Sequence, residues 1–210
     1  VAILCIVAGG AWFYRMQQDY VRQDIEPDLE TIAQLKVGQI VAWREDQLGE
    51  AEELSSSSFL AAGVEQWFAN PASSPEYILQ RFRSLQHHYG YLDVIMVDTN
   101  GHVRLSLAGI HHEVHTGARE DLATALREGR PVLTDLHTGE VAAAPHVSAI
   151  APLFVGAGSE RRAIGAVILV NDASKFLYPL VQSWPTPSES SETLLIRRDG
   201  DSALFLNNLK

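Results

Sequence analysis

The sequence predicts an α+β domain in which a long N-terminal helix packs on an antiparallel sheet. Three stretches with helical periodicity come first, and five short strand-like runs, with one short helix among them, follow. Consecutive strands are expected to pair antiparallel, since helices and strands do not alternate along the chain. No glycine-rich loop follows a strand, which excludes a dinucleotide-binding fold and a P-loop.

The composition is that of a folded, acidic protein. The 210 residues are 46% hydrophobic and 20% charged, as in globular chains, and the formal net charge is -10. Because phosphate binding requires clustered Lys and Arg, a nucleic-acid partner is excluded. Cys5 is the only cysteine, so an internal disulfide and a thiolate metal site are excluded as well.

Residues 1–15 predict a truncated transmembrane helix. The stretch VAILCIVAGGAWFY carries no charge and ends in three aromatic residues followed by Arg15, the pattern of a span that leaves the hydrocarbon region. A complete span needs about 20 apolar residues, so the chain is expected to begin within one. A signal peptide and a buried core helix are the alternatives, although the bulky aromatics occupy the place of a small-residue cleavage site.

The residues after this stretch are expected to lie outside the cytoplasm. The flank beyond Arg15 is rich in Asp and Glu and poor in Lys and Arg, whereas cytoplasmic flanks are enriched in basic residues. The predicted location is therefore the inner membrane, with the body of the chain periplasmic or extracellular.

Residues 16–54 predict one long amphipathic helix, in which Pro27 is a break signal and Gly38 an isolated glycine before the end. Apolar residues recur at the spacing of a single helical face. They are Leu29, Ile32, Ala33, Val37, Ile40, Val41, Leu48 and Ala51. Continuous with the span, this helix would be a rod that lifts a globular body off the membrane; an ordinary surface helix is the alternative.

The body is predicted over residues 55–184. Residues 59–69 form a helix, Ser74 caps a third helix whose first residue is Pro75, and further helices cover 119–128 and 173–184. The strands are expected at 92–98, 102–107, 131–135, 146–154 and 163–171.

Two hairpins are predicted from turns that need glycine. Residues 92–107 give strand, Asp-Thr-Asn-Gly turn and strand, with Val103, Leu105 and Leu107 on one buried face. Residues 193–206 repeat this outline around an Asp-Gly turn. The stretch 185–191, PTPSESS, is predicted to be a linker, and 192–210 to be the beginning of a second lobe.

These features together resemble the double Cache sensor domains, which are PAS-like domains of bacterial membrane receptors. The resemblance rests on the span, the long helix, the Asp/Asn-Gly hairpin and the segment 176–207, FLYPLVQSWPTPSESSETLLIRRDGDSALFLN. It implies that 55–184 is the membrane-distal, ligand-holding lobe and that the long helix carries the signal. The Arg-x-Trp-Tyr pattern of amino-acid-sensing members is absent, since residues 83–89 read RSLQHHY.

Polar side chains on otherwise apolar strands are the candidate ligand-binding residues, because small-molecule sites are apolar clefts with a few convergent polar groups. The predicted set is Tyr91, Arg104, Ser106, Asp135, His137, His146, Ser148 and Asp172. His146 and Ser148 alternate with apolar residues and are therefore expected to face one side together.

Several of these residues have structural alternatives. Arg104 and Ser106 fit solvated residues on the polar side of a strand equally well. Asp135 and His137 fit the chemistry of a turn, and Asp172 fits the N-cap of a helix that starts at Ala173.

Residues 111–115, HHEVH, hold the ligand types that zinc and copper prefer. Their spacing is not that of His-Glu-x-x-His, and flanking glycines favour a flexible loop. We therefore predict no metal and no cofactor.

The sequence predicts a small-molecule sensing module that is not itself an enzyme. The resemblance implies a receptor that is a sensor histidine kinase of a two-component system and forms a homodimer. The alternatives are the sensor of a diguanylate cyclase or a chemoreceptor, or a dimerisation module without a ligand.

Overall fold

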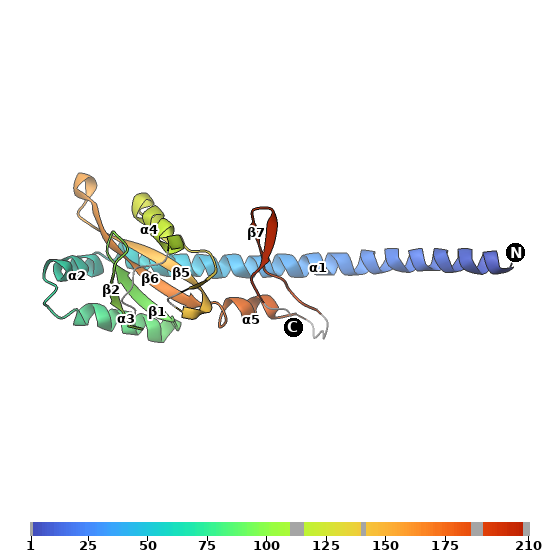
Figure 1. Ribbon diagram of the computed structural model, residues 1–210, viewed down its shortest axis with the longest axis horizontal. Helices are drawn as coiled ribbons and strands as arrows, with labels where there is room; N and C mark the ends of the chain where they lie inside the picture. The colour runs from blue at the N-terminus through green and yellow to red at the C-terminus, as the bar shows by residue number, and fades with distance from the viewer. Residues whose placement is uncertain (1, 110–115, 140–141, 186–190, 208–210) are drawn as a thin grey trace.

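The computed structural model describes residues 2–109, 116–139, 142–185 and 191–207. Helix α1 runs from Ala2 to Ser56 without interruption and passes through Pro27. Its N-terminal half projects from the body as a free rod, and its C-terminal half packs on the sheet (Figure 1). The predicted long helix is confirmed, and it includes the apolar N-terminal stretch.

In the described part of the chain, none of the helices combines the length and the apolar content that a membrane crossing requires.

One stripe of α1 is buried where the helix reaches the body. Its members are three, four or seven residues apart, which places them on one face. They are Lys36, Trp43, Gln47, Ala51 and Leu54. The stripe contains two polar residues, so the helix is fixed to the body by more than apolar packing.

Lys36 connects α1 to the last helix of the body. Its Nζ donates hydrogen bonds to the carbonyl oxygen of Leu180 at 2.7 Å and to Ser183 Oγ at 2.6 Å. The side chain is only 4% exposed, and burial lowers the pKa of the ammonium group. These two bonds fix the position along α1 at which the end of the body is attached.

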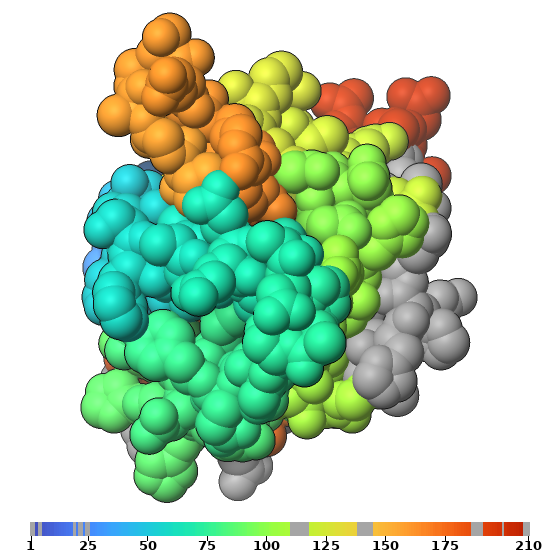
Figure 2. Space-filling view, turned by 90° about the vertical axis from the view of Figure 1, so that its left-hand side faces the viewer, coloured from blue at the N-terminus to red at the C-terminus, as the bar shows by residue number. Residues whose placement is uncertain are grey.

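Helices α2 (Ser58–Ala69) and α3 (Glu76–Tyr89) form the end of the body that is farthest from the N-terminus (Figures 1 and 2). Ser57 caps α2 by accepting a hydrogen bond from the amide of Leu60. The predicted Ser74 cap of α3 is wrong, because Pro75 occupies the N-cap position and its carbonyl already accepts from Leu79 N at 2.9 Å.

The sheet is antiparallel, with the strand order β2-β1-β6-β5-β3 and β4 paired on β5. Its strands are β1 (Asp93–Val97), β2 (Val103–Ser106), β3 (Val132–Leu133), β4 (His137–Gly139), β5 (Ala142–Val155) and β6 (Arg162–Asp172). The predicted α+β class is therefore confirmed. The strand predicted at 131–135 is shorter than expected, and β4 was not predicted.

Each face of the sheet is covered by different helices. Helices α1, α2 and α3 cover one face, where Val94, Met96 and Leu169 belong to the core. Helix α4 (Thr116–Glu128) covers the opposite face, where Ile95 and Ile168 belong to a second core. Strands β1 and β6 are therefore buried on both sides, which explains their continuous apolar sequences.

The β1–β2 hairpin contains a bulge that changes which residues share a face. Val97 pairs with Val103, but Met96 pairs with Leu105, so Arg104 is the additional residue. Val103 consequently packs on the α4 side, whereas Leu105 packs with α1, α2 and α3. The prediction of one shared face for these apolar residues is wrong for this reason.

Helix α5 spans only Leu177–Gln182, so the helix predicted over 173–184 is wrong at both ends. Asp172 Oδ1 accepts from the amide of Ser174 at 2.9 Å and from its Oγ at 2.5 Å. This side chain holds a turn that competes with helix formation. At the other end, Ser183 is extended just before the Trp184-Pro185 pair.

The second predicted hairpin is confirmed. Strands β7 (Ile196–Asp199) and β8 (Ser202–Phe205) pair antiparallel around Gly200, whose φ is +59°. Tyr178 Oη donates to the carbonyl oxygen of Leu206 at 2.6 Å, and this bond joins the hairpin to α5.

Gly165 is predicted to be essential for the sheet. Its φ is +149°, and a Cβ added there would overlap the carbonyl oxygen of Val97 on the neighbouring strand. We expect Gly165→Ala to lower the free energy of unfolding by about 3 kcal/mol, measured by urea denaturation.

The matched control is Gly38→Ala on α1, where an added Cβ meets nothing within 4 Å. It should raise the free energy of unfolding by up to about 1 kcal/mol, because alanine is the better helix former. Equal stability of Gly165→Ala and the unsubstituted chain would contradict the close strand contact.

Candidate functional site

The α4-facing side of the sheet is apolar along most of its length and polar at one end. On β5, His146 and Ser148 lie on the same side as Ile150, which packs against α4. On β6, Asp172 lies on this side too and is the register partner of His146. His146 is 1%, Ser148 4% and Asp172 8% exposed. We call these three residues the polar end of the sheet.

Strand β4 brings a second imidazole to the polar end. His137 and His146 are register partners, and their ring centroids lie 4.3 Å apart with an interplanar angle of 62°. Nδ1 of His137 lies 2.7 Å from the carbonyl oxygen of Asp135, a distance that fits an N–H donor. That bond would leave Nε2 of His137 as the hydrogen-bond acceptor.

Helix α4 contributes a carboxylate that the sequence analysis missed. Burial raises the pKa of Asp121, while the nearby His137 lowers it and the negative charges of Glu120 and Asp135 raise it further. Asp121 is therefore close enough to interact electrostatically with the β4 histidine. Its sequence signal was weak, because acidic residues on a surface helix are common.

Asp172 has a structural role at the polar end as well. Its Oδ1 holds the Ser174 turn, and Oδ2 lies 3.7 Å from the exposed ammonium of Lys175. The predicted alternative, an N-cap for a helix starting at Ala173, is wrong because α5 begins at Leu177. The carboxylate is thus fixed in position by its own chain neighbours.

Ser106 belongs to a second polar group on β1 and β2, organised by Asp93. Asp93 is 2% exposed and accepts a hydrogen bond from Ser106 Oγ at 2.6 Å. It also accepts from the amides of Val94 (2.7 Å), Leu107 (2.9 Å) and Ala108 (3.0 Å). Four donors stabilise this buried carboxylate and fix the end of β2.

Asp135 lies at the rim and contacts the C-terminal hairpin. Its Oδ2 is 2.6 Å from Arg197 Nη1 on β7, and the same guanidinium lies 3.3 Å from the carbonyl oxygen of Leu136. The rim beside His137 is therefore attached to the beginning of the predicted second lobe. A cavity of about 350 Å³ lies next to this contact, lined in part by His137, Tyr178 and Arg197.

Two predicted residues lie away from the polar end. Tyr91 is 4% exposed, packs in the core beneath α1 and donates a hydrogen bond to Glu50. Burial and this bond raise the pKa of Tyr91, and burial also raises the pKa of Glu50. Arg104 stacks on Phe68 of α2, with its guanidinium carbon 4.8 Å from the ring centroid.

The possible metal ligands at 111–115 lie outside the described residues. Among the residues that the structure does describe, no three His, Cys, Asp or Glu side chains come together as a metal site would require. The polar end and its neighbours His137 and Asp121 together present two imidazoles, the Ser148 hydroxyl and the Asp121 and Asp172 carboxylates.

A scan of protein-family models gave no match, and a search of curated proteins gave none either. Solved structures do match. The sensor domain of the Vibrio cholerae histidine kinase DctB aligns with a TM-score of 0.57 at 13% identity, over 73% of this chain and 58% of that one. The ligand-binding domain of the Campylobacter jejuni chemoreceptor Tlp3, in complex with 4-methylisoleucine, gives a TM-score of 0.52 at 15% identity.

The Tlp3 alignment covers 75% of this chain and 61% of that one, so the chain spans about three-fifths of the length of each structure. The predicted fold, that of Cache-type sensor domains, is confirmed by these likenesses.

Asp121 gives the site a predicted pH signature. Because its pKa is raised in the folded state, folding takes up a proton, and stability falls as pH rises through the window above the ordinary Asp pKa of about 3.8. We expect Asp121→Asn to raise the melting temperature at pH 7. The difference in melting temperature from the unsubstituted chain should disappear as the pH falls to about 3.8, the ordinary pKa of Asp.

Glu120→Gln removes the same charge from the neighbouring, exposed position of α4 and serves as the control. A melting-temperature gain that is equal in both variants, or constant with pH, would show that burial of Asp121 is not its origin.

Proposed function

We propose that this chain is the extracytoplasmic sensing module of a membrane receptor and that it binds a small molecule at the polar end beneath α4. The observation that carries this proposal is the burial of His146, Ser148 and Asp172 together at one end of a sheet face whose remaining length packs apolar residues against α4. Buried polar groups are costly, and a ligand site is a common reason for grouping them.

The chemistry of the polar end favours a ligand that donates hydrogen bonds. The carboxylates of Asp121 and Asp172 are hydrogen-bond acceptors. An ammonium or amide group of the ligand fits this arrangement, whereas a dicarboxylate would face like charges.

Helix α1 is the proposed output element. It packs on the sheet face opposite the polar end, through Trp43 against Val147 and through Ala51 and Leu54 in the larger core. Val147 lies between His146 and Ser148 on β5, so a shift of this strand alters the contact with α1. A ligand changes the balance between two positions of α1 only if it binds one of them more tightly.

We propose membrane attachment through residues 1–15 and a sensor body on the periplasmic or extracellular side. The receptor is proposed to be a sensor histidine kinase, with a chemoreceptor or a diguanylate cyclase as the alternatives. Both a histidine kinase and a chemoreceptor share this fold.

A homodimer is also proposed, since α1 carries apolar residues that the described body leaves uncovered. Leu29 is 49%, Val37 60% and Val41 47% exposed. This observation alone would favour the second candidate function, a dimerisation module that binds no ligand.

A thermal-shift screen separates these two functions. Amino acids, amines, carboxylates and nucleobases are tested on the purified chain; a compound at 100 times its Kd stabilises a folded protein by about 2.7 kcal/mol. We expect a shift from one chemical class, and we expect Asp172→Asn and Ser148→Ala to weaken it.

Arg104→Ala is the control, because Arg104 stacks on α2 and lies away from the polar end. If the ligand no longer raised the melting temperature of Arg104→Ala but still raised that of Asp172→Asn, the ligand site would lie on the sheet face that α1, α2 and α3 cover. A screen without any shift, together with a dimer in ultracentrifugation, would favour the dimerisation module.

A further inference from the structure

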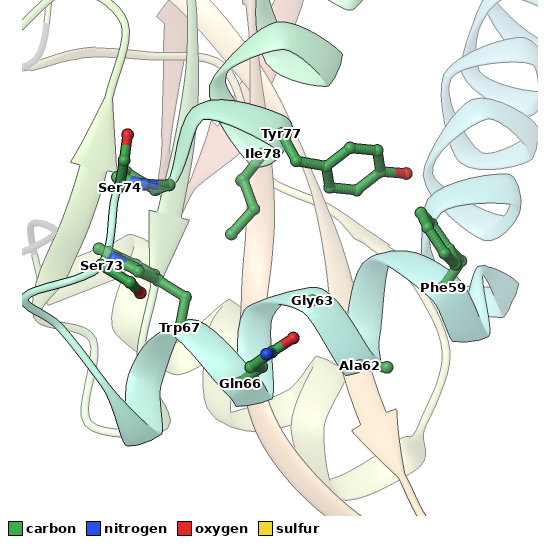
Figure 3. A pocket seen from close by; sticks show the side chains of 10 residues that line it. Phe59, Ala62, Gly63, Gln66, Trp67, Ser73, Ser74, Tyr77 and Ile78 are labelled. Carbon is green, nitrogen blue, oxygen red and sulfur yellow. The ribbon is translucent and has the colours of Figure 1, made fainter.

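A separate cavity lies between α2 and α3, on the opposite side of the sheet from the polar end. It measures about 410 Å³, within the range of about 300–1,000 Å³ for small-molecule pockets. Figure 3 shows Phe59 of α2 near Tyr77 of α3, Ile78 pointing toward α2, and Trp67 beside Ser73. We call this cavity the tip groove.

The tip groove is hollow because small residues line α2 where it faces α3. Ala62 and Gly63 stand in the middle of this helix, although glycine disfavours a helix interior. A Cβ added to Gly63 would lie 3.8 Å from Cδ1 of Tyr77, so the position points into the groove. Larger side chains at these two positions would close the space.

Two aromatic rings at the groove remain in contact with solvent. Phe59 is 68% and Tyr77 48% exposed, and their ring centroids lie 5.0 Å apart in an edge-to-face arrangement. The core of α2 and α3 is made instead by Val64 and Phe82, both fully buried. The two exposed rings therefore add little to folding and present aromatic surface to an occupant.

The lining carries no Asp, Glu, Lys, Arg or His among its described residues, in a chain whose formal net charge is -10. Its polar groups are the amide of Gln66 and the hydroxyls of Ser73, Ser74 and Tyr77. Desolvating a charged ligand against such walls is unfavourable, because no opposite charge compensates it. A neutral flat molecule with one amide-like end matches both the aromatic walls and the hydrogen-bonding groups.

One wall of the groove also connects to the sheet. The Trp67 ring lies against Phe68, with centroids 5.3 Å apart, and Arg104 stacks on both rings. Arg104 Nη1 lies 3.7 Å from Asp98 Oδ2 in the β1–β2 turn. An occupant that moves Trp67 therefore acts through Arg104 on the β1–β2 hairpin. Asp93 fixes the opposite end of this hairpin by its hydrogen bonds at the end of β2.

We propose that the tip groove is a second small-molecule site and that it takes an uncharged, flat ligand. It is distinct from the polar end, since the core and the sheet separate the two. Occupation of the groove would stiffen α2 against α3 and act on the sheet through Trp67 and Arg104.

The test uses three probes of the same shape and different charge: benzamide, benzoate and benzylamine. Each is titrated into the isotope-labelled chain, and amide resonances are followed by NMR. We expect benzamide to shift the resonances of Ala62, Gly63, Gln66 and Tyr77. Each charged probe should bind with a Kd at least about tenfold higher than that of benzamide. Equal binding of all three probes, or shifts that do not include α2 and α3, would overturn the proposal.

Gly63→Leu tests the location of binding. Leucine is a better helix former than glycine, so α2 should stay folded while the side chain fills the groove. Benzamide binding should be lost in this variant and retained in Gly38→Leu, where an added Cβ meets nothing within 4 Å. Retained binding in Gly63→Leu would overturn the proposal.

The tip-groove proposal and the proposed ligand site at the polar end are independent, and one variant distinguishes them. In Gly63→Leu, any compound found in the thermal-shift screen to depend on Asp172 should still raise the melting temperature fully.

Discussion

The pairing of β5 with β6 is the interaction on which the rest of the structure depends. Their register runs from His146↔Asp172 to Val155↔Arg162, and both strands are covered on two sides. Because side chains alternate, odd-numbered residues such as Ala149 and Leu169 face α1, and even-numbered ones such as Ile150 face α4. A register slip of one residue would place the polar end against α1.

The sequence was most informative where a short-range rule sets the structure. Turn chemistry identified both hairpins, and helical periodicity identified α1, α2 and α4. The alternation of His146 and Ser148 with apolar residues correctly placed them on one face. These features depend on neighbours within a few residues, which a single sequence contains.

Other features depend on partners that are distant in the sequence. The bulge at Arg104 arises from pairing with β1, so alternation within β2 alone gave the wrong face for Val103. Asp93 was missed because it stands in a continuous apolar run, where no period separates the two faces. Asp121 lies near His137 only because α4 covers the sheet, and the hydrogen bond of Tyr91 to Glu50 joins residues that are far apart in the sequence.

Pro27 gives the rod a mechanical property. Proline has no amide hydrogen, so the carbonyl of Gln23 lacks its usual donor four residues later, although α1 continues through this position. The missing hydrogen bond removes part of the support that keeps the helix straight at this position. We therefore expect α1 to bend more easily near Pro27 than elsewhere along its length.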